Sequence, residues 1–70
     1  MTAVKVIISV KNDFKTQEVV DRLKEAGLTV ELVLEESGII IGIVDENHFE
    51  ALKTITGVGV VVEDSLSSVS

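Results

Sequence analysis

The chain contains no cysteine, proline, tyrosine or tryptophan, and only two phenylalanines. Without cysteine, neither disulfide bonds nor thiolate metal sites can form. The scarcity of aromatic rings removes the usual stacking platforms and the anchors that are most common in protein interfaces. We therefore expect no metal site and no cofactor.

Positive charge is also scarce, since the chain has 6 basic against 12 acidic residues and a formal net charge of -6. Such a chain repels phosphate backbones and anionic lipid surfaces. Its longest apolar runs, residues 38–44 and 57–62, are far shorter than a membrane-spanning helix. The N-terminus lacks the charged-then-apolar layout of a signal peptide. We predict no nucleic-acid partner, no membrane partner and a cytoplasmic location, with export by another route left open.

Hydrophobic residues make up 46% of the 70 residues, which predicts one folded domain and leaves no room for a second. Residues 4–11 and 28–35 alternate with the period of two that is typical of β-strands. Shorter apolar runs predict two more strands at residues 39–44 and 58–62. Gly38 can adopt a positive φ, so the short turn around it is expected to join the second and third strands as a hairpin.

Two segments carry helical periodicity. In residues 14–26 one stripe is apolar and charged residues cover the opposite side, while Gly27 follows as a C-terminal stop. The second helix is expected to begin after Asp45, a good N-cap, and to end before Gly57. The apolar stripes consist of Val19, Val20, Leu23 and Ala26 in the first helix and Phe49, Leu52 and Ile55 in the second.

This order of elements predicts an α+β fold of the ferredoxin-like, βαββαβ type. In that fold two helices cover one face of a four-stranded antiparallel sheet. We assign residues 1–64 to this domain and residues 65–70 to a polar C-terminal tail. Because both helices lie on one side, the other face of the sheet is expected to stay open.

Alternation along the strands predicts which side chains occupy each face of the sheet. Those expected to face the helices are Val4, Val6, Ile8, Val30, Leu32, Ile39, Ile41 and Ile43. The apolar side chains expected at the centre of the open face are Ile7, Val33, Ile40, Val44 and Val61. Apolar patches with a polar rim often mark protein-interaction sites, although β-branched residues also favour strands by propensity.

No arrangement of residues in the sequence is typical of a catalytic site. His48 is the only histidine, and no serine, aspartate or cysteine pattern around it forms a triad. The acidic pairs lack the alternating ligand spacing of a calcium loop. The glycines at positions 57 and 59 follow a helix and are too few for a phosphate-binding fingerprint. We therefore predict a protein without enzymatic activity, which acts by binding another molecule.

Three motifs of the second half resemble a known family. Residues 38–46 form a glycine-bearing apolar strand, residues 49–52 a helix motif with a leucine, and residues 57–64 the ending Gly-Val-Gly-Val-Val-Val-Glu-Asp. These motifs are similar to those of subtilisin propeptides and propeptide-like peptidase inhibitors. The resemblance implies the same βαββαβ fold. It also implies that the open sheet face docks on two parallel helices of a subtilisin-like serine protease.

The resemblance further assigns roles to the end of the chain. Asp64 would cap a helix N-terminus of the protease, where carboxylates are favoured. The last residues would occupy the substrate cleft in an extended form, and these are Ser67, Ser68, Val69 and Ser70. Val62 stands where the family has its first capping acid, and Ser70 stands where tight inhibitors have a large side chain. The function that the resemblance implies is a stand-alone inhibitor or folding helper of such a protease.

Two alternatives stay open. A non-inhibitory relative of the fold could pair its open face with a second copy, as a homodimer, or with another protein. A small-ligand regulatory domain of the amino-acid-sensing kind would need a glycine-bearing loop after the first strand, and residues 11–14 contain no glycine.

Overall fold

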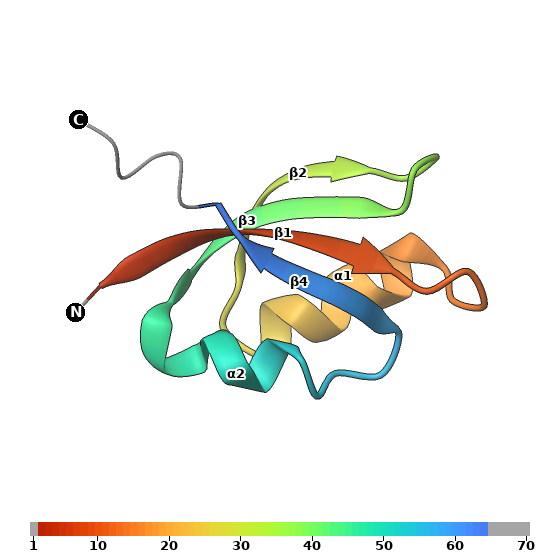
Figure 1. The fold of residues 1–70 in the computed structure, drawn as a ribbon. Coiled ribbons are helices and arrows are strands. Elements are labelled where there is room, and N and C mark those ends of the chain that lie inside the picture. The colour runs from red at the N-terminus through yellow and green to blue at the C-terminus, as the bar shows by residue number, and fades with distance from the viewer. Residues whose placement is uncertain (1, 65–70) are drawn as a thin grey trace.

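The computed structural model describes residues 2–64, whose elements follow the predicted order (Figure 1). The elements are β1 (Ala3–Val10), α1 (Thr16–Glu25), β2 (Thr29–Leu34), β3 (Ile39–Asp45), the 3₁₀ helix η1 (Glu46–His48), α2 (Phe49–Leu52) and β4 (Val58–Glu63). The four strands form one antiparallel sheet in the order β2-β3-β1-β4. This is the ferredoxin-like topology, so the predicted α+β fold is confirmed.

Helix α1 is an amphipathic segment whose apolar side packs on the sheet. Val19, Val20 and Leu23 are buried, as the periodicity predicts. The helix begins at Thr16, and Phe14 packs against the core from the preceding loop. Gly27 follows the helix with a φ of 106°, the left-handed conformation that glycine tolerates best.

The second helical segment is short and is held by its cap and its apolar side. The Asp45 carboxylate accepts a hydrogen bond from the backbone N–H of Asn47 at 2.8 Å, which confirms the predicted N-cap. One 3₁₀ turn leads into α2, where Leu52 is fully buried, and Phe49 packs beside it against the core. Because so short a helix has little stability of its own, this packing holds it in place.

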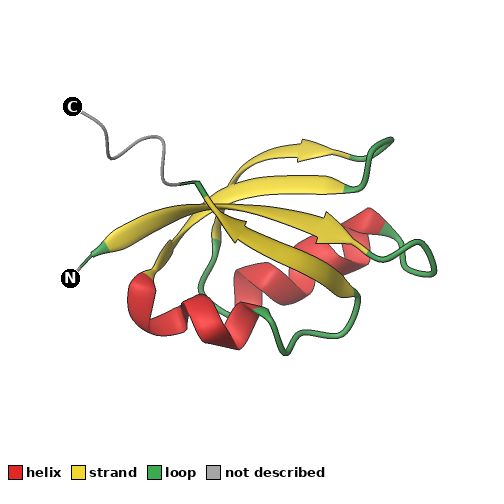
Figure 2. Ribbon diagram, viewed as in Figure 1, coloured by secondary structure: helices red, strands yellow, loops and turns green. Residues whose placement is uncertain are grey.

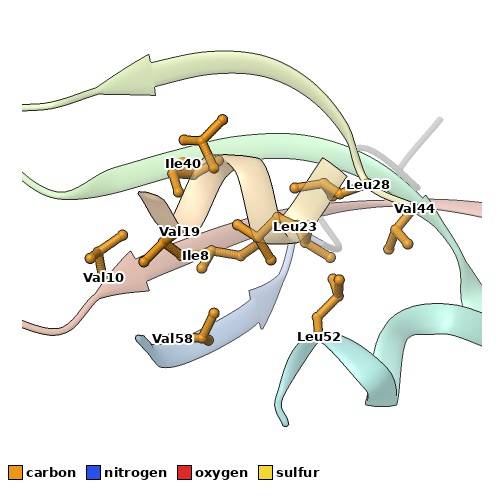
Figure 3. Close-up of a cluster of buried hydrophobic side chains, with 11 residues drawn as sticks. Ile8, Val10, Val19, Leu23, Leu28, Ile40, Val44, Leu52 and Val58 are labelled. Carbon is orange, nitrogen blue, oxygen red and sulfur yellow. The ribbon is translucent and has the colours of Figure 1, made fainter. Parts of the chain in front are cut away.

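The hydrophobic core lies between the sheet and the helices, which occupy the same side of the sheet (Figure 2). Ile8, Leu23 and Leu52 are fully buried there and belong to one cluster (Figure 3). Within residues 2–64 no polar or charged residue is buried. The core therefore contains no side-chain group that needs a buried hydrogen-bond partner.

The prediction of which side chains of β3 face the helices, which we call the phase of the strand, is wrong. Ile40 and Val44, predicted on the open face, have exposed fractions of 0% and 2% and belong to the core. Alternation cannot choose the phase here because both sides of this strand are apolar. Gly42 lies on the inner side with them, where a Cβ atom would come within 2.5 Å of the Thr29 carbonyl oxygen. The close approach of the chain entering β2 therefore requires glycine on the inner side.

In β2 the predicted inner position of Val30 is confirmed, but the face assignment beyond it is wrong because the strand contains a bulge. Val30 and Leu32 pair with consecutive residues of β3, which leaves Glu31 as one extra residue between them. An extra residue moves all later side chains to the opposite face. Val33, predicted on the open face, therefore packs against the core, whereas Leu32 and Leu34 are exposed.

Strand β4 carries a similar irregularity. Val58 and Val60 pair with consecutive residues of β1, so Gly59 is the extra residue. Beyond it Val61, predicted on the open face, packs against the core, and that prediction is wrong too. Val60 and Val62 instead point to the open side, with exposed fractions of 56% and 51%.

Candidate protein-binding face

The open face of the sheet carries apolar side chains across all four strands. Directly paired residues of antiparallel strands point to the same face, so the strand register arranges these side chains in rows. The central row, from β2 to β4, is Leu32, Ile41, Ile7 and Val62. One flanking row is Leu34, Ile39, Ser9 and Val60, and the other contains Thr29, Ile43 and Lys5. We call their apolar members the open-face patch: Ile7, Leu32, Leu34, Ile39, Ile41, Ile43, Val60 and Val62.

Exposure within the open-face patch is greatest on the two edge strands. Leu32 and Leu34 on β2 are 49% and 42% exposed, and Val60 and Val62 on β4 are 56% and 51% exposed. The isoleucines of β1 and β3 lie between these strands and are half-buried. Scattered apolar residues are normal on protein surfaces, but a contiguous set of this kind is typical of a site that another molecule covers.

Of the five residues predicted at the centre of this face, only Ile7 lies in the open-face patch. Its neighbours in β1, Val6 and Ile8, are fully buried, so this strand alternates as predicted. Most of the patch was missed because the phases of the other three strands were wrong. Gly42 is the signal that could have corrected β3, since a glycine inside a strand often marks the close approach of another backbone. Only the inner side has helices and their connections to make that approach.

The three rows that contain the open-face patch carry almost no charge. Among the described residues whose pairing forms the three rows, Lys5 is the only charged one. The chain nevertheless carries 12 acidic residues. Those of α1, such as Glu18 and Asp21, are exposed on the helical layer, and Glu31 is exposed at the β2 bulge. These acidic residues therefore lie outside the three rows, and Asp64, which is hydrogen-bonded to Lys5, stands at one corner of them.

Asp64 marks the point at which the chain leaves the sheet. Its backbone N–H donates a hydrogen bond to the Lys5 carbonyl oxygen at 2.8 Å, and the residue is half-buried. This bond places Asp64 at a corner of the open-face patch, beside the row that contains Lys5. The predicted subsite residues Ser67, Ser68, Val69 and Ser70 lie outside the described residues.

Other features of the described chain are less well defined as sites. His48 is exposed where η1 meets α2, and residues 2–64 bring together no set of three or more side chains that could hold a metal ion. No helix in that part of the chain is long and apolar enough to cross a membrane. An open hollow of about 510 Å³ between α1 and the β2–β3 turn is lined by Gln17, Val33, Leu34, Glu35, Glu36 and Ser37.

No protein-family model and no curated protein matches the chain. The role of the open-face patch is therefore inferred from its geometry and chemistry.

Proposed function

We propose that this chain is a small, non-enzymatic binding protein that inhibits a subtilisin-type serine protease, or assists its folding. The open sheet face docks on the protease, and the C-terminal tail extends into the substrate cleft. The observation that carries this proposal is the open-face patch, an apolar surface that crosses all four strands and that nothing within residues 2–64 covers. The resemblance of residues 38–64 to propeptide-like inhibitors supports the choice of partner.

The width of the open-face patch fits a pair of helices. Its central row crosses three strand spacings of about 4.8 Å each, and the row therefore spans about 14 Å between the outer strands. Two packed helices lie about 8–10 Å apart, so both can contact the same sheet face. Leu32 and Val62, at the ends of this row, would each border one helix, with Ile7 and Ile41 between them.

The position of Asp64 also supports the proposal. It stands at the corner of the open-face patch from which the chain continues. A carboxylate at this corner can cap the N-terminus of a docked helix, an interaction typically worth about 0.3–1 kcal/mol. The tail would then begin at the docked edge rather than on the opposite, helical layer.

The first test compares the intact chain with a chain that ends at Asp64 as inhibitors of subtilisin. We expect the intact chain to inhibit and the shortened chain to bind at least tenfold more weakly, because it loses the contacts in the substrate cleft; a factor of ten corresponds to about 1.4 kcal/mol. The measurement is the inhibition constant from steady-state peptide hydrolysis. Absence of inhibition by both chains would overturn the proposal for this protease class.

A second test separates the sheet face from the tail. Ile41→Glu places a charge at the centre of the open-face patch and should weaken inhibition even though the tail is intact. Ala51→Glu adds the same charge at an exposed position of α2, on the other side of the molecule, and should leave inhibition unchanged. Equal inhibition by both variants would show that the open-face patch is not the docking surface.

A further inference from the structure

The open-face patch is also suited to a second copy of the same chain. In a symmetric dimer one patch contacts its own image, and an aliphatic surface with almost no charge is compatible with itself. The helices lie on the far side of the sheet (Figure 2). Two sheets can therefore approach to the face-to-face spacing of about 10 Å that is typical of packed sheets.

The distribution of charge permits this contact despite the net charge of -6. Among the described residues, Lys5 is the one charged residue within the rows of the open-face patch, and the acidic Asp64 stands beside it at their corner. The acids of α1 lie on the helical layer. In a face-to-face pair the two helical layers are on the outside, separated by both sheets. That separation exceeds the Debye length of about 8 Å at physiological ionic strength, so repulsion between the layers is screened.

The size of the open-face patch sets the strength expected of such a contact. Four strands and three rows, with their side chains, cover about 20 Å by 20 Å, or on the order of 400 Å² per copy. Two copies together bury on the order of 800 Å², whereas stable complexes bury about 1,200–2,000 Å². An apolar contact of this size is typical of weak, reversible association.

We infer that the free chain forms a reversible face-to-face homodimer through the open-face patch. Because the same patch docks on the protease in the proposed function, this dimer competes with docking, and only the monomer can bind the target. The competition rests on the proposed function, but the dimer does not. A weak dimer covers the apolar surface when the chain is abundant and releases it on dilution or in the presence of a tighter partner.

Sedimentation velocity of the full chain, from micromolar to millimolar concentration, tests the inference without any protease. We expect the average mass to rise from the monomer mass of 7.5 kDa toward twice that value. Ile41→Glu and Leu32→Glu should remain monomeric over the whole range, because each places a charge in the central row. Ala51→Glu, which adds the same charge on α2, should associate like the unmodified chain.

Three results would overturn the dimer: a monomer at millimolar concentration, undiminished association of Leu32→Glu, or equal loss of association in Ala51→Glu. Circular dichroism establishes that each variant is folded, and Leu32, 49% exposed, serves as the decisive site if Ile41→Glu does not fold. Inhibition by a monomeric chain would remove this inference and leave the proposed function. Dimerisation without inhibition would remove the proposed function and leave the dimer.

Discussion

The inner and outer faces of the sheet are built from the same kinds of side chain, yet residues 2–64 cover only the inner face. Ile8 and Ile40 on the inner face are fully buried, while Ile7 and Ile41, one position away, are half-buried on the outer face. Ile8 and Ile40 belong to the core cluster between the sheet and the helices (Figure 3), whereas Ile7 and Ile41 do not belong to it. The core is therefore defined by the apolar sides of the helices, because the composition of the sheet alone does not distinguish its faces.

The sharpest test of this comparison places the same charge on each face at neighbouring positions of β3. Ile40→Glu should abolish folding, because a charge buried without a partner costs several kcal/mol. A domain of this size is stable by only about 4–10 kcal/mol. Ile41→Glu should lower the free energy of unfolding by about 1 kcal/mol through lost strand propensity and cross-strand contacts. Far-UV circular dichroism and urea titration measure both effects.

The unmodified chain provides the reference for this pair. If Ile41→Glu unfolded the protein and Ile40→Glu did not, the assignment of the two faces would be reversed. If both variants folded with similar stability, the helices would not bury one side of β3.

The same comparison shows what the sequence can predict. The order of helices and strands could be predicted because it depends on short-range features of the sequence. Examples are the apolar stripe of Val19 and Leu23, the N-cap at Asp45 and the helix stop at Gly27. The two faces did not follow in the same way. A period of two predicts a face only when one side is polar, and bulges such as that at Glu31 shift the period by one residue. Residues 39–44 offer apolar side chains or glycine on both sides, so their phase depends on tertiary packing.

An intermediate loss of stability is expected at Gly42, where the inner face of β3 lies against the start of β2. Gly42→Ala places a Cβ atom 2.5 Å from the Thr29 carbonyl oxygen and 3.2 Å from the Leu28 side chain. Overpacking of this kind costs about 1–3 kcal/mol, and the backbone oxygen cannot move aside as a side chain can. Urea denaturation measures the loss.

Gly59→Ala is the matched control for this glycine. Its added Cβ would lie 3.2 Å from the Ser9 carbonyl oxygen and 3.5 Å from the Lys11 side chain. It lies in an edge strand and should cost less than about 1 kcal/mol. A larger loss in this variant than in Gly42→Ala would contradict the close approach on the inner face.

The smallest expected loss of stability tests the bulge in β2, which decides which of its side chains lie on each face of the sheet. Val33→Thr introduces a hydroxyl group on the side that packs against the core, which should cost about 1 kcal/mol because the hydroxyl is partly removed from water. Leu34→Thr changes a side chain that is 42% exposed in the open-face patch, and its cost should stay within about 0.5 kcal/mol. Thermal and urea denaturation of both variants measure the difference. The order of the two losses carries the inference, because strict alternation without the bulge would place Leu34 in the core and Val33 outside and would reverse that order. Only the phase set by Glu31 makes the larger residue the one that can be replaced at little cost.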